Sequence, residues 1–104
     1  MIEKVYRFTQ SKANMMEKLV VDESVNIAHV MLPPGEEVPP HPANTNVYMT
    51  VLHGTLSITL AEQDEQDYES GAILNFPFGT VMGARNRADE TLELFVVKAP
   101  APQD

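Results

Sequence analysis

The sequence contains no cysteine and no tryptophan, and basic residues are scarce in it. The absence of cysteine excludes disulfides, thiolate metal sites and cysteine nucleophiles, and it leaves the redox compartment open. Seven Lys and Arg residues stand against fifteen Asp and Glu residues, which gives a formal net charge of −8. Long-range repulsion therefore opposes binding to nucleic-acid phosphates or to anionic lipid surfaces. We expect neither nucleic acid nor a membrane as a partner.

Long apolar runs are also lacking, since no stretch approaches the ~20 apolar residues that a membrane helix requires. The amino terminus, Met-Ile-Glu-Lys-Val-Tyr-Arg, does not show the charged-then-apolar pattern of a secretory signal. Cytoplasmic localisation is the resulting expectation. A length of 104 residues, of which 43% are apolar, predicts one domain over residues 1–104.

Proline and glycine are frequent after residue 32, so no long helix can run through the middle of the chain. Between these breaks lie short runs rich in β-branched, aromatic and other apolar residues, which predict strands. The predicted strands cover residues 25–32, 47–52, 55–61, 72–76 and 91–98. Such spacing is typical of an all-β sandwich or barrel.

The ends of the chain are predicted separately. Residues 1–24 form an amino-terminal edge-strand region, and within them residues 11–19 are the best helix candidate. The acidic residues 62–67 are read as a solvated hairpin loop that runs into its return strand. Residues 100–104 offer little to bury and are expected to form a flexible tail.

Two stretches carry a regular spacing of glycine, proline and polar residues. The first runs from Gly35 over five residues to His41, and its following strand ends at Gly54. The second has spacings of five, one, two and three residues between its members, which are Gly71, Pro77, Gly79, Met82 and Asn86. Glycines suit the turns between strands, and the proline stiffens a loop. We expect Gly54 and Gly71 to permit turns and Gly79 to permit a close backbone approach.

With these spacings the sequence resembles the cupin family, whose motifs read Gly-x5-His-x-His-x3,4-Glu-x6-Gly and Gly-x5-Pro-x-Gly-x2-His-x3-Asn. The resemblance implies a double-stranded β-helix, or jelly-roll barrel, and a small single-domain protein. The family's metal ligands are the two histidines and the glutamate of the first motif and the histidine of the second. Only His41 matches, because Ala43, Val47 and Met82 occupy the other three positions. Neither Ala nor Val has a donor atom, and a thioether suits copper(I) rather than harder ions. We therefore expect no metal and no cofactor.

The predicted ligand-binding residues are His41, Val47, Met49, Phe76 and Met82. Strand alternation places Val47, Met49 and Val51 on one face, which is the barrel interior in the cupin frame. His41 is expected there as the last polar member of an apolar pocket. Its roles stay open between a hydrogen-bonded residue at the barrel mouth, an anchor for a small molecule, an acid/base group and a residual metal ligand.

Several polar and aromatic residues are weaker candidates for functional residues. His29 lies on a predicted strand and faces either solvent or the interior, and His53 precedes a turn. Arg85 and Arg87 are candidates to attract an anionic ligand to the mouth. The remaining candidates, each with packing or loop formation as its simpler explanation, are Asn44, Thr45, Asn46, Tyr48 and Phe78.

The sequence leaves four functions open, and whether the protein is an enzyme is undecided. The favoured hypothesis is a cupin-like barrel that binds a small, largely apolar molecule without the usual metal. The second is a metal-dependent dioxygenase or isomerase that uses His41 with ligands outside the motifs, such as His29 or Asn46. The third is a metal-independent enzyme with His41 as base, and the fourth is a purely structural dimeric barrel. A homodimer is expected, because pairing removes the liability of an exposed edge such as residues 5–8.

Overall fold

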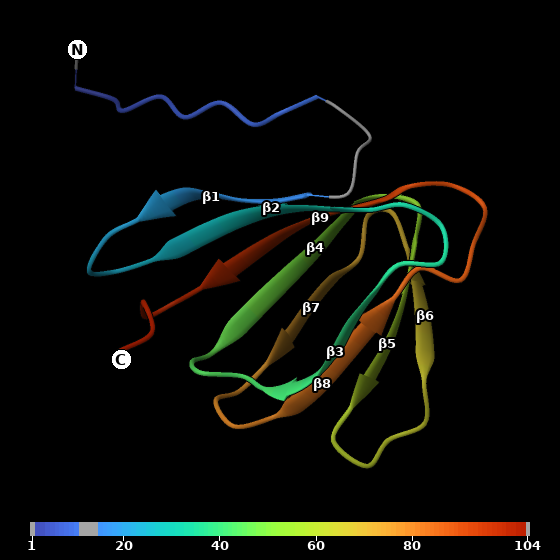
Figure 1. The fold of residues 1–104 in the computed structure, drawn as a ribbon. Coiled ribbons are helices and arrows are strands. Elements are labelled where there is room, and N and C mark those ends of the chain that lie inside the picture. Colours follow the sequence, from blue (N-terminus) through green and yellow to red (C-terminus); the bar gives the residue numbers. More distant parts are fainter. Residues whose placement is uncertain (1, 11–14, 104) are drawn as a thin grey trace.

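The computed structural model describes residues 2–10 and 15–103, and these residues form strands and loops without any helix. None of them therefore belongs to a helix long and apolar enough to cross a bilayer. Figure 1 shows the nine strands. Their bounds are β1 Met15–Val21, β2 Asn26–Leu32, β3 Glu37–Pro42, β4 Val47–His53, β5 Thr55–Leu60, β6 Gln66–Glu69, β7 Ile73–Phe76, β8 Val81–Arg85 and β9 Leu92–Lys98.

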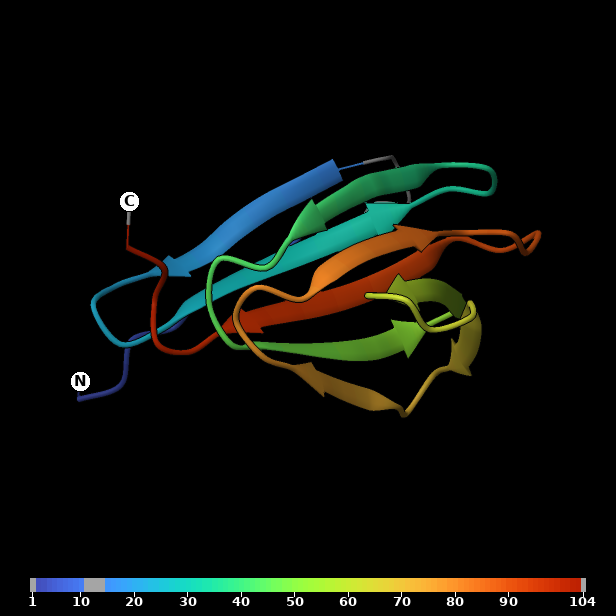
Figure 2. The same ribbon diagram turned by 90° about the horizontal axis from the view of Figure 1, so that it is seen from below.

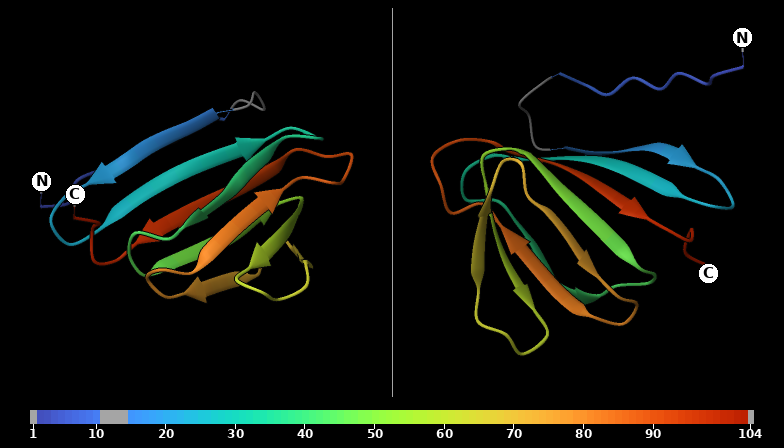
Figure 3. Two further views of the ribbon diagram at one scale, coloured as in Figure 1. Left: turned by 60° about the horizontal axis from the view of Figure 1, so that its bottom comes forward. Right: turned by 180° about the vertical axis from the view of Figure 1, so that it is seen from behind.

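The strands form two facing antiparallel sheets. One sheet has five strands in the order β1-β2-β9-β4-β7, and the other has four in the order β3-β8-β5-β6. The chain passes from one sheet to the other six times, between β2 and β3, β3 and β4, β4 and β5, β6 and β7, β7 and β8, and β8 and β9. The two layers are seen in Figure 2 and in the left view of Figure 3. At one end, the β1–β2 hairpin projects beyond the four-stranded sheet (Figure 1).

The core lies between the sheets, as strand alternation predicts. Val47, Met49 and Val51 of β4 are all buried, and Leu56, Leu92 and Leu94 are at most 1% exposed. Burying an aliphatic side chain of this size contributes about 1.5–3 kcal/mol. The five strands predicted from the sequence are all present, and each differs from its predicted range by one residue at one end.

The helix predicted over residues 11–19 is wrong where the structure tests it. Residues 15–19 belong to β1, which pairs with β2 from Met15↔Met31 to Val21↔Asn26. Residues 11–14 lie outside the described residues. Local propensity is a weak signal, and pairing with a neighbouring strand overrides it here.

The sequence prediction also missed β3, because its residues include three prolines. β3 pairs only with β8 and forms the edge of the four-stranded sheet. Proline has no N–H for a ladder, so it is tolerated at such an edge. The register of this pair shifts between Val38 and His41, where Pro39 and Pro40 interrupt the alternation.

Two of the motif positions require glycine for partly different structural reasons. Gly54 has a φ of +83°, and a Cβ added to it would lie 2.7 Å from the backbone oxygen of Thr91. Gly79 has a φ of +86° but no atom within 4 Å of an added Cβ. Both positions therefore need glycine for backbone conformation. The close backbone approach occurs at Gly54, so the prediction of a close approach at Gly79 is wrong.

The motif asparagine, Asn86, cross-links the loops at one end of the barrel. Its side chain is buried, and Nδ2 donates to the backbone oxygens of Leu32 at 2.8 Å and Glu90 at 2.6 Å. Its Oδ1 accepts from the backbone N–H of Ala88 at 3.0 Å. All the usual hydrogen bonds of this buried amide are thus made within the loops, as expected for a structural role.

The carboxyl-terminal segment begins with hydrogen bonds to the loop before β4, and the flexibility of residues 100–104 stays a prediction. The hydroxyl of the buried Thr45 donates to the backbone oxygen of Pro100 at 2.6 Å. The backbone N–H of Ala99 donates to the oxygen of Asn46 at 3.2 Å. Residues 101 and 102 are half-buried, and residue 104 lies outside the described part of the chain.

Candidate functional site

A cavity of about 450 Å³ lies between the two sheets. Strands β1, β2, β9 and β4 form one wall, and β3 and β8 contribute to the other. All five predicted ligand-binding residues line it, and four of them are buried apolar side chains: Val47, Met49, Phe76 and Met82. The structure therefore brings the predicted set together, and binding by these residues stays a prediction.

His41, the fifth residue, is exposed at the edge of the cavity and is not a buried interior group. Its Nδ1 lies 3.0 Å from the backbone oxygen of Pro39. The expectation of an interior histidine is wrong because β3 is an edge strand whose alternation is broken by prolines. The geometry matches the simplest of the roles left open, a hydrogen-bonded histidine at the barrel mouth.

The cavity does not offer the donor set that a metal ion needs. Ala43, Val47 and Met82 are buried in its wall at the three remaining motif positions. Two of these side chains have no donor atom, and the third has only a soft thioether. Within residues 2–10 and 15–103, no group of three or more His, Cys, Asp and Glu side chains is arranged to hold a metal. The residues present do not fit the metal site of the motif.

One end of the cavity is polar, which the sequence analysis did not foresee. Asn26 of β2 and Lys98 of β9 are direct partners in the five-stranded sheet, and both line the cavity. The Lys98 ammonium donates to Oδ1 of Asn44 at 3.1 Å, and Asn44 also lines the cavity. Lys18 adds a second ammonium group from β1. The sequence does contain a signal for the inward position of Lys98, because this residue has the same strand parity as the inward-facing Val96.

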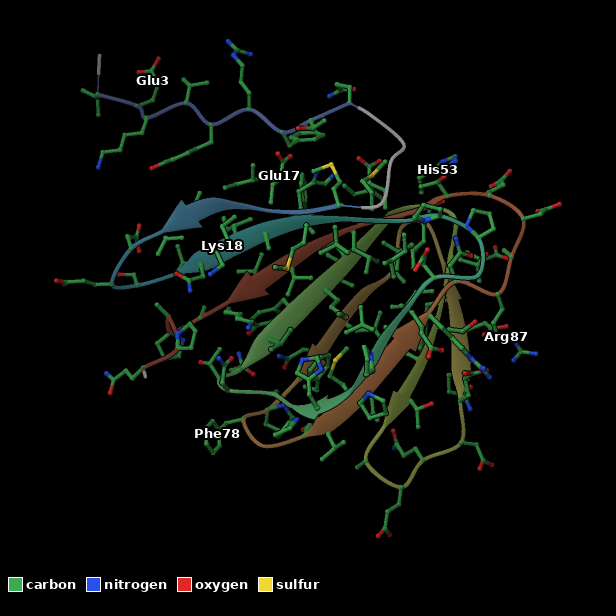
Figure 4. All side chains as sticks on the ribbon, in the orientation of Figure 1. Glu3, Glu17, Lys18, His53, Phe78 and Arg87 are labelled. Carbon is green, nitrogen blue, oxygen red and sulfur yellow. The ribbon has the colours of Figure 1, made fainter. Side chains whose placement is uncertain are left out.

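The buried histidine of the protein is His29, on the outer face of the five-stranded sheet. Its side chain is 0% exposed, with Nδ1 at 3.0 Å from Glu17 Oε1 and Nε2 at 2.7 Å from Glu93 Oε2. Figure 4 shows Glu17 and Lys18 leaving opposite faces of β1. His29 is thus enclosed between two acids, on the far side of the sheet from the cavity.

The segment of residues 2–10 covers His29. The ring of Phe8 lies 4.9 Å from the His29 ring and 5.0 Å from that of Phe95. Glu17 accepts from the backbone N–H of Thr9 at 2.7 Å and from its hydroxyl at 2.9 Å. The Thr9 N–H, with the hydroxyl and His29, lowers the pKa of Glu17 below its ordinary value. These contacts attach an otherwise exposed segment to the sheet.

The two arginines expected to attract a ligand to the mouth are engaged elsewhere. Arg85 Nε and Arg87 Nη1 each lie 2.6 Å from the Glu65 carboxylate. The hydrogen bond from Arg85 lowers the pKa of Glu65. Neither arginine lines the cavity, and Figure 4 shows Arg87 outside the sheets. The prediction for this pair is therefore wrong.

The remaining weak candidates also lie away from the cavity. His53 is exposed in its turn, 3.8 Å from Glu90 Oε2. Phe78 projects from the β7–β8 turn and Tyr48 from β4, and both are exposed (Figure 4 for Phe78). Asn46 accepts from the Asn75 side chain at 2.9 Å. Asn44 is the exception, because it lines the cavity, and the other weaker candidates do not.

Comparison with known proteins matches residues 28–98 to the cupin domain family. The chain belongs to the cupin family. This cupin is 42% identical, over 99% of its length and 90% of the other chain, to an uncharacterized protein of Methanocaldococcus jannaschii. A solved RmlC-like cupin family protein with a double-stranded β-helix fold from the same organism is 43% identical, with a TM-score of 0.93. That alignment covers 98% of this chain and 94% of the other.

A more distant likeness agrees on the fold alone. The solved cupin superfamily protein of Desulfitobacterium hafniense has 15% identity and a TM-score of 0.76. The alignment covers 89% of this chain and 83% of that protein. The predicted all-β double-stranded β-helix is thus confirmed, and so is the family that the motif spacing indicated.

Proposed function

We propose that this cupin binds a small, largely apolar molecule in the cavity between its sheets, without the metal ion of the family motif. The observation that carries the proposal is a cavity of about 450 Å³ with buried side chains of Val47, Met49, Phe76 and Met82 in its wall. Ligand pockets in proteins are commonly about 300–1,000 Å³ and mostly apolar, with a few polar groups that fix orientation. This cavity has both parts.

The metal-dependent enzyme is less well supported, because its extra ligands cannot gather at His41. His29 lies on the outer face of the sheet with both ring nitrogens engaged by carboxylates. The amide oxygen of Asn46 accepts from Asn75. A metal-independent enzyme with His41 as base lacks the carboxylate that would orient the ring, since its Nδ1 faces the oxygen of Pro39.

A purely structural barrel is also less well supported, since a core of that kind would be filled. The space between these sheets instead reaches the size of a ligand pocket. In addition, the buried Oδ1 of Asn26 has no partner among the described residues. Buried polar atoms without partners are uncommon, and a rotation of this side chain toward the cavity would let a bound molecule satisfy the atom.

Uptake of an apolar probe tests the proposal. Metal-stripped protein is titrated with fluorescent phenylnaphthylamine, and binding is compared with the variants Met82→Arg and Ala28→Phe, both at cavity-lining positions. We expect both variants to lose at least about tenfold in affinity, because one adds a charge and the other fills space. Phe78→Arg, at an exposed position, is the matched control and should bind like wild type. Equal uptake by all four proteins would contradict the proposal.

We further propose that the protein forms a homodimer through the outer face of the five-stranded sheet. Because Val47, Met49 and Val51 face inward, Tyr48 and Leu52 project outward from β4. Ile73 of the edge strand β7 is 68% exposed beside them. Apolar side chains gathered on one face are typical of protein interfaces. The same face carries the segment of residues 2–10.

A further inference from the structure

The polar end of the cavity is built from three strands and a loop that meet at one row of the sheet. Asn26 pairs with Lys98, and Lys98 pairs with Val47 on its other side. Side chains at directly opposed positions are about 5 Å apart at Cβ and share one face. The loop before β4 adds Asn44, which holds the Lys98 ammonium at 3.1 Å. Asn26 and Lys98 therefore lie side by side at the same end of the cavity wall.

The Lys98 ammonium has no carboxylate partner within the described part of the chain, whose ion pairs involve other residues. Lys18, also on the cavity wall, is likewise absent from those pairs. The acid on the wall, Glu37, lies at the opposite end of β3 from the loop that carries Asn44. In a chain of net charge −8, a cation at an apolar cavity is a specific binding feature.

The second feature is the amide of Asn26. Its Oδ1 is a buried acceptor that has no hydrogen-bond partner in the described structure. Such an atom costs stability unless a donor reaches it. Because Oδ1 has almost no accessible surface, a ligand in the cavity can supply that donor only after the Asn26 side chain rotates toward the cavity that this residue lines.

From these observations we infer that the ligand is an apolar molecule that ends in a carboxylate and carries a hydroxyl or other hydrogen-bond donor beside it. The apolar body lies against Val47, Met49 and Met82, the carboxylate binds the Lys98 ammonium, and the neighbouring donor bonds Oδ1 of Asn26. The inference rests on the proposed function and specifies its ligand class.

A series of ligands with one carbon skeleton tests the carboxylate. Octanoate, octanol and octylamine are titrated into isotopically labelled protein, and affinities are taken from amide chemical-shift changes. Octanoate should bind at least about tenfold more tightly than octanol, and octylamine least tightly, because a hydrogen bond to a charged group is the stronger kind. Lys98→Met should remove the preference for octanoate over octanol, whereas Lys98→Arg should retain the preference.

Lys4→Met is the matched control, since Lys4 lies in the exposed amino-terminal segment and its loss changes the net charge equally. This variant should keep the wild-type preference. If octanol and octanoate bind wild type equally, the assignment of the carboxylate is wrong while the apolar cavity stands. If none of the three ligands binds, the proposed function itself fails.

The donor is tested with α-hydroxyoctanoate. It should bind wild type about fivefold more tightly than octanoate, because its hydroxyl donates to Oδ1 of Asn26. Asn26→Leu should abolish that difference. Equal binding of the two acids by wild type, or an unchanged difference in Asn26→Leu, would overturn the role of Asn26.

Discussion

Restoring the three missing motif ligands should turn the cavity into a metal site. The variant carries Ala43→His, Val47→Glu and Met82→His, so that four donor side chains, including His41, line one cavity. All three changed positions are buried. His41 can bind the metal through Nε2 while Nδ1 keeps its contact with the backbone oxygen of Pro39 at 3.0 Å.

The magnitudes make the experiment sensitive. Without metal, a carboxylate and two imidazoles in place of buried apolar groups should lower the free energy of unfolding by about 3–5 kcal/mol, out of a typical 5–15. Metal at about a thousandfold above its Kd restores about 4 kcal/mol. In a domain of this size, 1 kcal/mol corresponds to about 4 °C in Tm, so metal should raise the Tm of the variant by about 15 °C.

The assay is thermal unfolding by circular dichroism with and without Mn²⁺ or Zn²⁺, combined with metal analysis of desalted protein. Wild type should show less than about 2 °C of change and retain no stoichiometric metal. The variant with His41→Ala added should respond more weakly than the variant with all four donors. A folded four-donor variant that retains no metal, refolded in its presence if necessary, would refute the placement of the motif positions around one point.

Three further predictions concern stability and assembly. In urea denaturation, Gly54→Ala should lower the free energy of unfolding by about 1–3 kcal/mol more than Gly79→Ala. The two glycines have similar φ angles, but an added Cβ lies 2.7 Å from a backbone oxygen at Gly54 and meets no atom at Gly79. Equal losses of stability in the two variants would contradict the close approach at Gly54. The Glu17 pKa is lowered in the folded state, so its contact with the Thr9 N–H is stabilising above the ordinary value of 4.5 and is lost as the pH falls through the lowered pKa. The Thr9 amide resonance should therefore move in that acidic range, and an unchanged resonance would argue against the contact. Tyr48→Glu should shift the mass measured by light scattering from dimer to monomer, and a monomeric wild type would rule out the dimer.

The sequence predicted the strands whose two faces differ, because their β-branched and apolar residues alternate or run together. β4 is the clearest case, with Val47, Met49 and Val51 on the buried side. β1 was misread as a helix because its sequence, Met-Met-Glu-Lys-Leu-Val-Val, does not alternate between apolar and polar residues, and none of its side chains is fully buried. Pairing with β2, a contact between separate parts of the chain, decides its conformation.

For the site, motif spacing located the apolar wall but not the polar end. Lys98 ends a run of apolar residues and reads as the exposed end of a strand, although its parity places it inside. Asn26 stands at the start of an apolar run and has a side chain common in turns, so it too is read as lying outside the barrel. His41 was placed too deep, because two prolines in β3 break the alternation on which the inference depended. Register between strands, which supplies the partners Asn26 and Lys98, is a tertiary property.

The loop cross-link made by Asn86 has a consequence for how this barrel can change over time. Met82, at the motif's histidine position, lines the cavity, whereas Asn86 follows four residues later outside the lining and bonds the backbone at the end of β2 and in the loop after β8. The segment of residues 82–86 thus lines the cavity with one side chain and cross-links the loops with another. Exchange of the cavity residue alters which molecules fit and leaves the loop bonds untouched, so ligand preference can diverge among proteins that share this barrel.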